Sequence, residues 1–373
     1  MELTEFHGSL ILSSGALLWA FASPFWGNKS EVWGRKPVFV FGLFGYGIAS
    51  FFFGYLLSQG LLETFPVITL VILLMLVRAS IGVLLSASPT SALAYVADVT
   101  EGEKRTQGLA FISAAMGIGT ILGPGIGGLV VGLGLVAPIY LAAVLALIGA
   151  SISLVFLQKP VQHVTINKTK PMSFFDPRVR SLLIIGFFMF LTLSNAQIVM
   201  GFYFQDRLAL SPGETARQVG LAFAIKGIAA IFAQMWLVRV ICVSPIKLIK
   251  LGMPIILLSI ILFILGDSFL LLSTGMVFMG LGVGLSQPGF YSATSFAVGQ
   301  DEQGSVAGLS SATMAISSVV GQLFGGVFYM VENWLPFVIS GVFIAINIFL
   351  VYLIKTEKSG RALAKLTPGD NCE

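Results

Sequence analysis

Two basic residues inside long apolar segments have the clearest potential for chemistry in this 373-residue chain. Arg78 lies in "LVILLMLVRASIG" and Lys226 lies in "LAFAIKGIAAIFAQ". A cation in such a segment needs a counter-charge, water or a bound molecule, so it marks a functional site by default. A structural hydrogen bond to a polar neighbour such as Asn195 or Gln197 is the alternative for Lys226.

Further polar and aromatic side chains are expected to line the same substrate-binding cavity. They are Asn195, Gln197, Tyr203, Gln287, Phe290 and Tyr291. No catalytic pair of nucleophile and base is visible, which argues against an enzyme. Two cysteines and two histidines also predict no metal site and no disulfide framework. We therefore expect binding without catalysis and without a bound cofactor.

The elements that must position these residues are membrane helices. The chain is 56% hydrophobic and only 10% charged, whereas soluble domains are about 25% charged. Apolar runs of about 20 residues suffice to cross a bilayer. Eleven such runs predict an all-α integral membrane protein, with spans at about 8–27, 37–59, 66–96, 105–132, 135–157, 179–204, 216–239, 247–266, 268–294, 304–330 and 334–355.

The distribution of lysine and arginine predicts the orientation of these spans. When the loop 27–37 is placed in the cytoplasm, only two basic residues of the loops, Arg207 and Arg217, fall on the outer side of the membrane. All other basic residues of the loops then lie on the cytoplasmic side. Basic residues concentrate in cytoplasmic loops. The C-terminus is therefore predicted to be cytoplasmic.

The chain divides into two similar halves. We expect an N-terminal bundle over 1–156, a cytoplasmic linker over 157–178, a C-terminal bundle over 179–355 and a cytoplasmic tail over 356–373. Segment 82–128 is echoed by 282–326, and one shift of the sequence pairs Gly82 with Gly280 and Gly123 with Gly321. Such parallel repeats are typical of transporters whose halves rock about a central site.

The stretch "GIGTILGPGIGG" (117–128) combines six glycines with one proline. Ala115, Gly119, Gly123 and Gly127 recur every fourth residue, which predicts a smooth helix face for close packing. Pro124 would bend that helix, a fault that neighbouring helices can mend in a membrane. A phosphate-binding loop is disfavoured, because no Gly-Lys-Ser/Thr follows and no strand precedes the stretch.

Together these motifs resemble the major facilitator superfamily, in particular its twelve-helix drug:proton antiporters. The stretch 117–128 is similar to the antiporter motif of that family's fifth helix at Gly119, Gly123, Pro124, Gly127 and Gly128. Three other segments are also similar to family motifs: "GNKSEVWGRK" (27–36), "RASIG" (78–82) and "AYVADVTEGEKR" (94–105). The segment 27–36 departs from its family motif at Lys29, Glu31 and Val32. The resemblance implies two parallel-repeat bundles of five and six helices, with the family's first helix absent from this chain.

The resemblance also implies a cytoplasmic latch that closes the inner side of the transporter. Its residues would be Gly27, Glu31, Gly34, Arg35, Lys36, Asp98 and Arg105. Family precedent pairs Arg35 with Asp98, and it places Glu31 at the positive N-terminal end of the helix near Ser305. Gly27 and Gly34 would allow a tight turn. The alternative is that these basic residues only enforce topology.

The function implied is secondary active transport, most specifically proton-coupled export of amphipathic organic compounds by alternating access. The two span cations, and the absence of Asp and Glu from the eleven spans, favour a second interpretation: transport of a specific anionic metabolite, such as a carboxylate or a siderophore-like chelator. A non-transporting membrane scaffold is a third. The expected partners are membrane lipid, a small-molecule substrate and protons but not nucleic acid, for a monomer in the inner membrane of a bacterium.

Overall fold

The computed structural model describes residues 5–99, 126–158, 172–238, 243–299 and 302–353, together with the single residues 112, 115, 119 and 123. These described residues are almost entirely helical and contain no strand. Ten of their helices are long and apolar enough to cross a membrane, which agrees with ten of the predicted spans. The remaining predicted span, 105–132, lies largely outside the described residues, as does the predicted tail.

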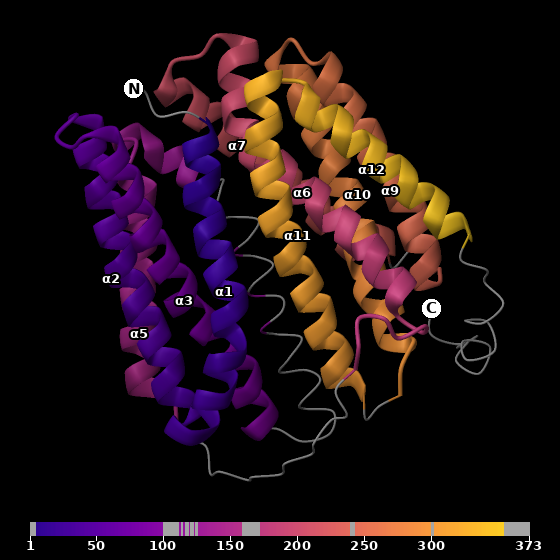
Figure 1. Ribbon diagram of the computed structural model, residues 1–373, viewed down its shortest axis with the longest axis horizontal. Helices are drawn as coiled ribbons and strands as arrows, with labels where there is room; N and C mark the ends of the chain where they lie inside the picture. The colour runs from indigo at the N-terminus through magenta and orange to yellow at the C-terminus, as the bar shows by residue number, and fades with distance from the viewer. Residues whose placement is uncertain are drawn as a thin grey trace. The chain divides into compact units, whose positions relative to one another are not determined.

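The first helical unit comprises Met1–Ile166 and Leu210–Leu221. Its helices are α1 (Glu5–Trp33), α2 (Arg35–Leu61), α3 (Val67–Val99) and α5 (Ala137–Phe156), with a short 3₁₀ turn at Val131–Leu133. Helix α3 packs against α1 and α2, and α2 packs against α5 (Figure 1). The unit is therefore a layered bundle, and α3 is held between two neighbours.

The second unit comprises Asn167–Ala209 and Ala222–Glu373. It contains α6 (Arg180–Leu208), the larger part of α7 (Pro212–Phe232), α9 (Pro245–Leu265), α10 (Phe269–Phe296), α11 (Gln303–Val331) and α12 (Leu335–Leu353). Helix α7 continues into a π-helical turn at Ala233–Leu237. Most of the α6 and α10 spans is buried, so these two helices form the core of the unit.

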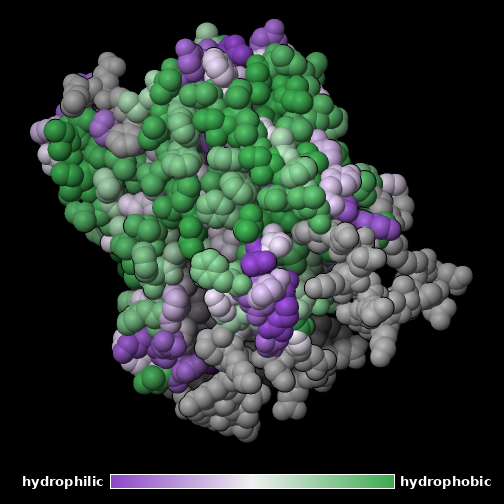
Figure 2. Space-filling model, turned by 45° about the vertical axis from the view of Figure 1, so that its right-hand side comes forward, coloured by the Kyte–Doolittle hydropathy of each residue, from purple (hydrophilic) through white to green (hydrophobic). Residues whose placement is uncertain are grey.

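The outer surface of both units is apolar. Large side chains such as Phe51, Leu76, Leu154, Phe349 and Tyr352 are exposed. Figure 2 shows apolar residues across the middle of one face, with polar residues gathered towards its ends. In water such a surface would aggregate, whereas in a bilayer it meets hydrocarbon. The chain is therefore a multi-pass integral membrane protein.

Glycines allow the closest helix crossings, and they recur at equivalent positions in the two units. A methyl group on Gly82 of α3 would lie 2.0 Å from the carbonyl oxygen of Gly15 in α1. A methyl group on Gly280 of α10 would lie 2.2 Å from the carbonyl oxygen of Lys226 in α7. Close backbone approach of this kind drives helix association in lipid. The sequence repeat that pairs Gly82 with Gly280 thus corresponds to the same kind of close helix crossing in both units.

This crossing predicts a sharp difference between two glycine-to-alanine variants. Gly82→Ala forces α1 and α3 apart, and overpacking of this kind costs about 1–3 kcal/mol. Gly149→Ala in α5 adds a methyl group that meets no atom within 4 Å and favours the helix. We expect the melting temperature in detergent to fall for Gly82→Ala and to hold for Gly149→Ala. Equal melting temperatures would contradict the tight crossing.

Candidate functional site

The predicted turn after the first span is made by Gly34 alone. Helix α1 continues to Trp33, Gly34 adopts a φ of 93°, and α2 begins at Arg35. A positive φ of this size is readily available only to glycine. Gly27 lies inside α1, and a methyl group there would meet only an ordinary contact at 3.6 Å. The prediction that Gly27 forms part of the turn is therefore wrong, because the helix extends past it.

Arg35 joins the α1–α2 turn to the end of α3. Its Nε donates to Asp98 Oδ2 at 2.8 Å, and its Nη1 donates to Ser30 Oγ at 2.6 Å and to the Gly27 carbonyl oxygen at 3.4 Å. Asp98 lies in the last turn of α3, where the helix dipole disfavours a negative charge. The Arg35 guanidinium offsets that cost. The pairing implied by the resemblance is present in the structure, while its role in gating stays a prediction.

The other predicted latch residues make fewer contacts with Arg35 and Asp98. Glu31 is exposed and lies 3.8 Å from Arg35 one turn away in sequence. Lys36 is half-buried beside it, and Arg105 lies outside the described residues. The approach of Glu31 to the helix near Ser305 joins two different units and stays a prediction. Within the first unit, the contacts of the predicted latch join Arg35 to Asp98, Ser30 and Glu31.

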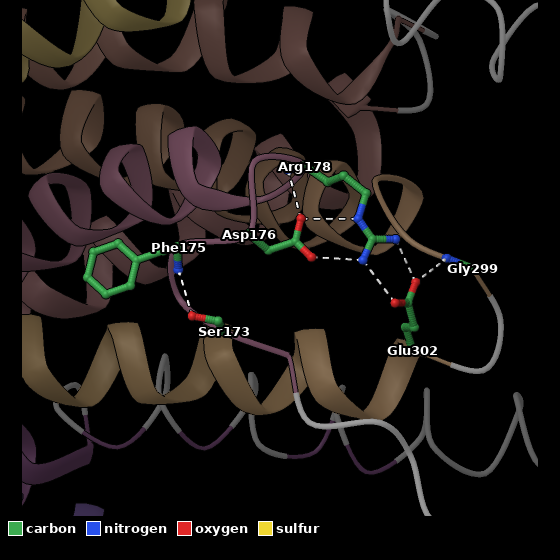
Figure 3. Close-up of polar contacts among 6 residues, drawn as sticks. All are labelled: Ser173, Phe175, Asp176, Arg178, Gly299 and Glu302. Atoms are coloured by element: carbon green, nitrogen blue, oxygen red, sulfur yellow. Dashed lines mark hydrogen bonds and ion pairs between the residues drawn. The ribbon is translucent and has the colours of Figure 1, made fainter.

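The second unit contains a cluster of one arginine and two acids that the sequence did not predict. Arg178 donates through Nε and Nη2 to both oxygens of Asp176, at 3.1 and 2.8 Å, and through Nη1 and Nη2 to both oxygens of Glu302, at 2.7 and 2.9 Å (Figure 3). Asp176 precedes α6 and Glu302 caps the start of α11. We call these three residues the Arg178 clamp. The only sequence signal was one arginine and two acids on the predicted cytoplasmic side.

Charge pairing in the Arg178 clamp shifts the protonation of its acids. Hydrogen bonds from the Arg178 side chain and backbone lower the pKa of Asp176 to about 2, from an ordinary value of 3.8. The side chain of Arg178 also lowers the pKa of Glu302, and the two carboxylates raise the pKa of Arg178. Both acids lie at helix N-termini, where the helix dipole favours negative charge. All three groups therefore stay ionised at neutral pH.

Arg78 is half-buried in the middle of α3 and lies against α1. A methyl group on Gly15 would come within 3.1 Å of Arg78 Cγ and 3.2 Å of its Nε. Its Nε is buried without a hydrogen-bond partner among the described residues. No described carboxylate forms an ion pair with it. The charge of Arg78 is thus uncompensated within the described structure.

Lys226 occupies the corresponding crossing in the second unit. Its Nζ lies 5.4 Å from the centroid of the Phe223 ring, one turn earlier in α7. None of the described residues forms an ion pair with it. A lysine at mid-span costs about 2.5–3.5 kcal/mol on insertion scales, and a cation–π contact recovers about 0.5–2 kcal/mol. A further interaction is therefore needed to explain a lysine at this position.

Three predicted cavity residues belong instead to the core of the second unit. Asn195 donates to the carbonyl oxygen of Pro336 and to Ser340 Oγ, at 3.0 and 2.9 Å, so it holds α6 to α12. Tyr203 is fully buried and donates to the carbonyl oxygen of Phe263 at 2.7 Å. Phe290 is fully buried against Phe190 and Gly186. These three side chains are buried within the second unit, where each packs or hydrogen-bonds between helices.

The other predicted cavity residues remain accessible. Gln197 is exposed on α6, and Tyr291 of α10 is 38% exposed. The Tyr291 hydroxyl lies 3.6 Å from Met314 Sδ of α11. Because Asn195 is engaged with α12 and no hydrogen bond joins Gln197 to Lys226 in the described structure, the structural interpretation of Lys226 finds no support. Gln197, Gln287 and Tyr291 stay candidates for substrate contact.

The glycine-proline stretch has one close backbone contact among its described residues. Ala115, Gly119 and Gly123 are exposed, and a methyl group on either glycine would meet no described atom within 4 Å. The close contact lies at Gly128, where a methyl group would come within 2.7 Å of Gly220 Cα in α7. Gly127 makes only an ordinary contact with Pro138, and Pro124 lies outside the described residues. Within the described part of the first unit, Gly119 and Gly123 have no close packing partner, and their predicted packing role stays a prediction.

Two acids lie in the helices just beyond the apolar spans that the sequence predicts. Helix α6 extends to Leu208 and so includes Asp206, whose Oδ2 accepts a hydrogen bond of 2.5 Å from the Tyr329 hydroxyl of α11. Glu214 lies in the first turn of α7. Both helices extend beyond their apolar segments. A polar residue at a helix end can do so because it lies at the membrane surface. The Asp206 carboxylate thus joins α6 to α11 through Tyr329.

Comparisons with known proteins agree with this architecture. The sequence model of the Major Facilitator Superfamily matches residues 2–315 and 182–369. The chain therefore belongs to the Major Facilitator Superfamily.

Individual relatives and a solved structure are similar over most of the chain. Multidrug resistance protein 2 of Bacillus subtilis is 26% identical over 97% of this chain and 90% of its own length. The class C tetracycline resistance protein of Escherichia coli is 26% identical over 85% of this chain and 78% of its own length. The crystal structure of a bacterial homologue of the human lysosomal transporter Spinster matches with a TM-score of 0.70 at 13% identity, over 97% and 90% of the two chains.

The Arg35–Asp98 pair predicts a strongly non-additive double-mutant cycle. Arg35→Ala and Asp98→Asn each break the same ion pair, so the double variant should melt little below Arg35→Ala alone. A coupling of about 0.5–3 kcal/mol is usual for groups in contact. Arg35→Ala should be the more damaging single change, because it also removes the hydrogen bond to Ser30. Lys36→Ala serves as the control, and additive losses would show that the two residues act independently.

The Arg178 clamp predicts a stabilisation that depends on pH. Because the pKa of Asp176 is lower in the folded protein, the clamp is fully present above about pH 4 and is lost as the pH falls towards 2. Arg178→Gln should lower the melting temperature at pH 7, and the difference from the parent protein should shrink below pH 4. Arg180→Gln, which removes a neighbouring exposed arginine with no ion pair in the described structure, is the control. A difference that stays constant with pH would refute the clamp.

Proposed function

We propose that this protein is a proton-coupled exporter of amphipathic organic compounds that works by alternating access. Curated relatives named for multidrug and tetracycline resistance match nearly the whole chain. Membership of the superfamily and two helical units with equivalent glycine crossings suit rocking of one half against the other. A transporter of this kind needs neither a metal nor a cofactor and performs no covalent chemistry.

The observation that carries this proposal best is the distribution of charge. The Arg35–Asp98 pair and the Arg178 clamp tie helix ends together, while Arg78 and Lys226 are unpaired among the described residues of the spans. Ionisable residues inside spans mark substrate or ion pathways. The expected partners are lipid, an organic substrate and protons, with the protein acting as a monomer in a bacterial inner membrane.

A second candidate function is transport of a specific anionic metabolite. Arg78 and Lys226 favour it, since each needs a negative partner and has no ion pair in the part of the chain that the structure describes. A carrier for a single small metabolite should move a labelled carboxylate and ignore drug-sized cations. A non-transporting scaffold should move neither compound.

Transport by the purified full-length protein in liposomes separates these functions. With an acidic lumen, we expect the protein to accumulate a fluorescent amphipathic drug several-fold faster than protein-free liposomes. Collapse of the pH gradient with nigericin should abolish this accumulation if protons drive it. Uptake of a labelled dicarboxylate but not of the drug would favour the metabolite carrier. Uptake of neither would overturn both transport functions.

A further inference from the structure

The crossing of α7 and α10 leaves the Lys226 side chain in an unusual position. Gly280 and Gly284 bring the backbone of α10 against the carbonyl oxygens of Lys226 and Ala230, where added methyl groups would lie at 2.2 and 2.6 Å. Ala229 and Ala233 complete the contact with their small side chains. The backbone at Lys226 is thus held firmly by α10.

The depth of Lys226 prevents its ammonium group from reaching water at the membrane surface. The span runs from Pro212 to Leu237, so Lys226 lies about 21 Å along it from the first residue at 1.5 Å per residue. Side chains near helix ends can extend to the interface, but a residue in the middle of a span cannot. The ammonium group points instead to the level of Phe223, with Nζ 5.4 Å from the ring centroid.

The three N–H donors of the ammonium group have no acceptor in the described structure. No hydrogen bond and no ion pair involves Lys226 among the described residues, and its Nζ lies 5.4 Å from the centroid of the Phe223 ring. Asn195, the polar neighbour expected from the sequence, donates to α12 instead. An ammonium with an aromatic face beside it and free donors matches a ligand that combines an aromatic ring with a negative charge.

We propose that Lys226 and Phe223 form a subsite for the anionic group of aromatic organic anions, with Lys226 contacting the negative group and Phe223 its ring. This assignment rests on the proposed export function for its physiological meaning and names a substrate class for it. The first unit has an arginine at the corresponding crossing, Arg78 beside Gly15. The binding claim concerns Lys226 alone.

The test compares two fluorescent dyes that share one aromatic core and differ in charge. Carboxyfluorescein is an anionic xanthene, and rhodamine 6G is a cationic xanthene. Their dissociation constants for the purified full-length protein are measured by fluorescence anisotropy in detergent. We expect Lys226→Met to weaken carboxyfluorescein binding about tenfold or more, with rhodamine 6G binding unchanged or tighter. Lys226→Arg should keep carboxyfluorescein binding within about threefold of the parent, because the charge is retained.

Lys250→Met provides the matched control. Lys250 of α9 also lies over an aromatic ring, with Nζ 4.9 Å from the centroid of Tyr352, but it is near the start of its helix. We expect this variant to bind both dyes like the parent protein. If Lys226→Met fails to fold, Lys226→Gln replaces it, and its melting temperature is recorded beside its affinities.

The outcomes separate the subsite from the transport function. Unchanged carboxyfluorescein affinity in the Lys226 variants, or an equal loss for both dyes, would overturn the subsite. Counterflow of the two dyes in liposomes then tests transport without any driving gradient. If the parent protein binds carboxyfluorescein through Lys226 but moves neither dye, export is refuted while the subsite stands.

Discussion

The absence of water from the bilayer interior is the constraint on which the rest of this structure depends. Every backbone group in the membrane must be satisfied within the protein, so the chain crosses as helices. Lipid is as apolar as the side chains, so no hydrophobic driving force brings the helices together. They associate instead through close backbone contact and buried hydrogen bonds. Gly15 with Gly82, and Lys226 with Gly280, supply the close contacts. Asn195 and Asn347 supply buried bonds to α12 and α6, where the Asn347 amide donates to the carbonyl oxygen of Ile185 at 3.0 Å.

The same constraint divides the charged residues into two groups. Near helix ends, water and helix dipoles make ion pairs affordable, and there Arg35 and Arg178 connect elements that are distant in sequence. In the middle of spans, no such support exists. Arg78 and Lys226 lie there beside glycine crossings, without an ion pair in the described structure. A fold that needed only stability would replace them with apolar residues, since unpaired charge in a dry interior is costly. Their presence is the strongest structural argument for a bound, charged substrate.

The candidate site was predicted unevenly, and the errors have a common cause. The unpaired span cations were visible from residue type and position alone, because hydropathy shows depth in the membrane. Tyr203, Phe290 and Asn195 were misassigned, because polar or aromatic character does not reveal which face of a helix meets a neighbour. Asp206 was overlooked, because α6 extends beyond its apolar core. The Arg178 clamp was missed, because Asp176 and Glu302 are separated by more than a hundred residues and only the fold brings them to one arginine.

The sequence by itself determined the class of fold, the spans and the two-fold repeat. These features follow from local properties, namely the length of apolar runs and the period of small residues, which any bilayer enforces. Only the tertiary structure decided that Gly82, Gly280 and Gly128 are sites of close backbone contact. The tertiary structure alone decided which polar side chains are hydrogen-bonded and which have no partner among the described residues. Both outcomes depend on which helix face another helix covers, and that choice is made by packing many segments at once.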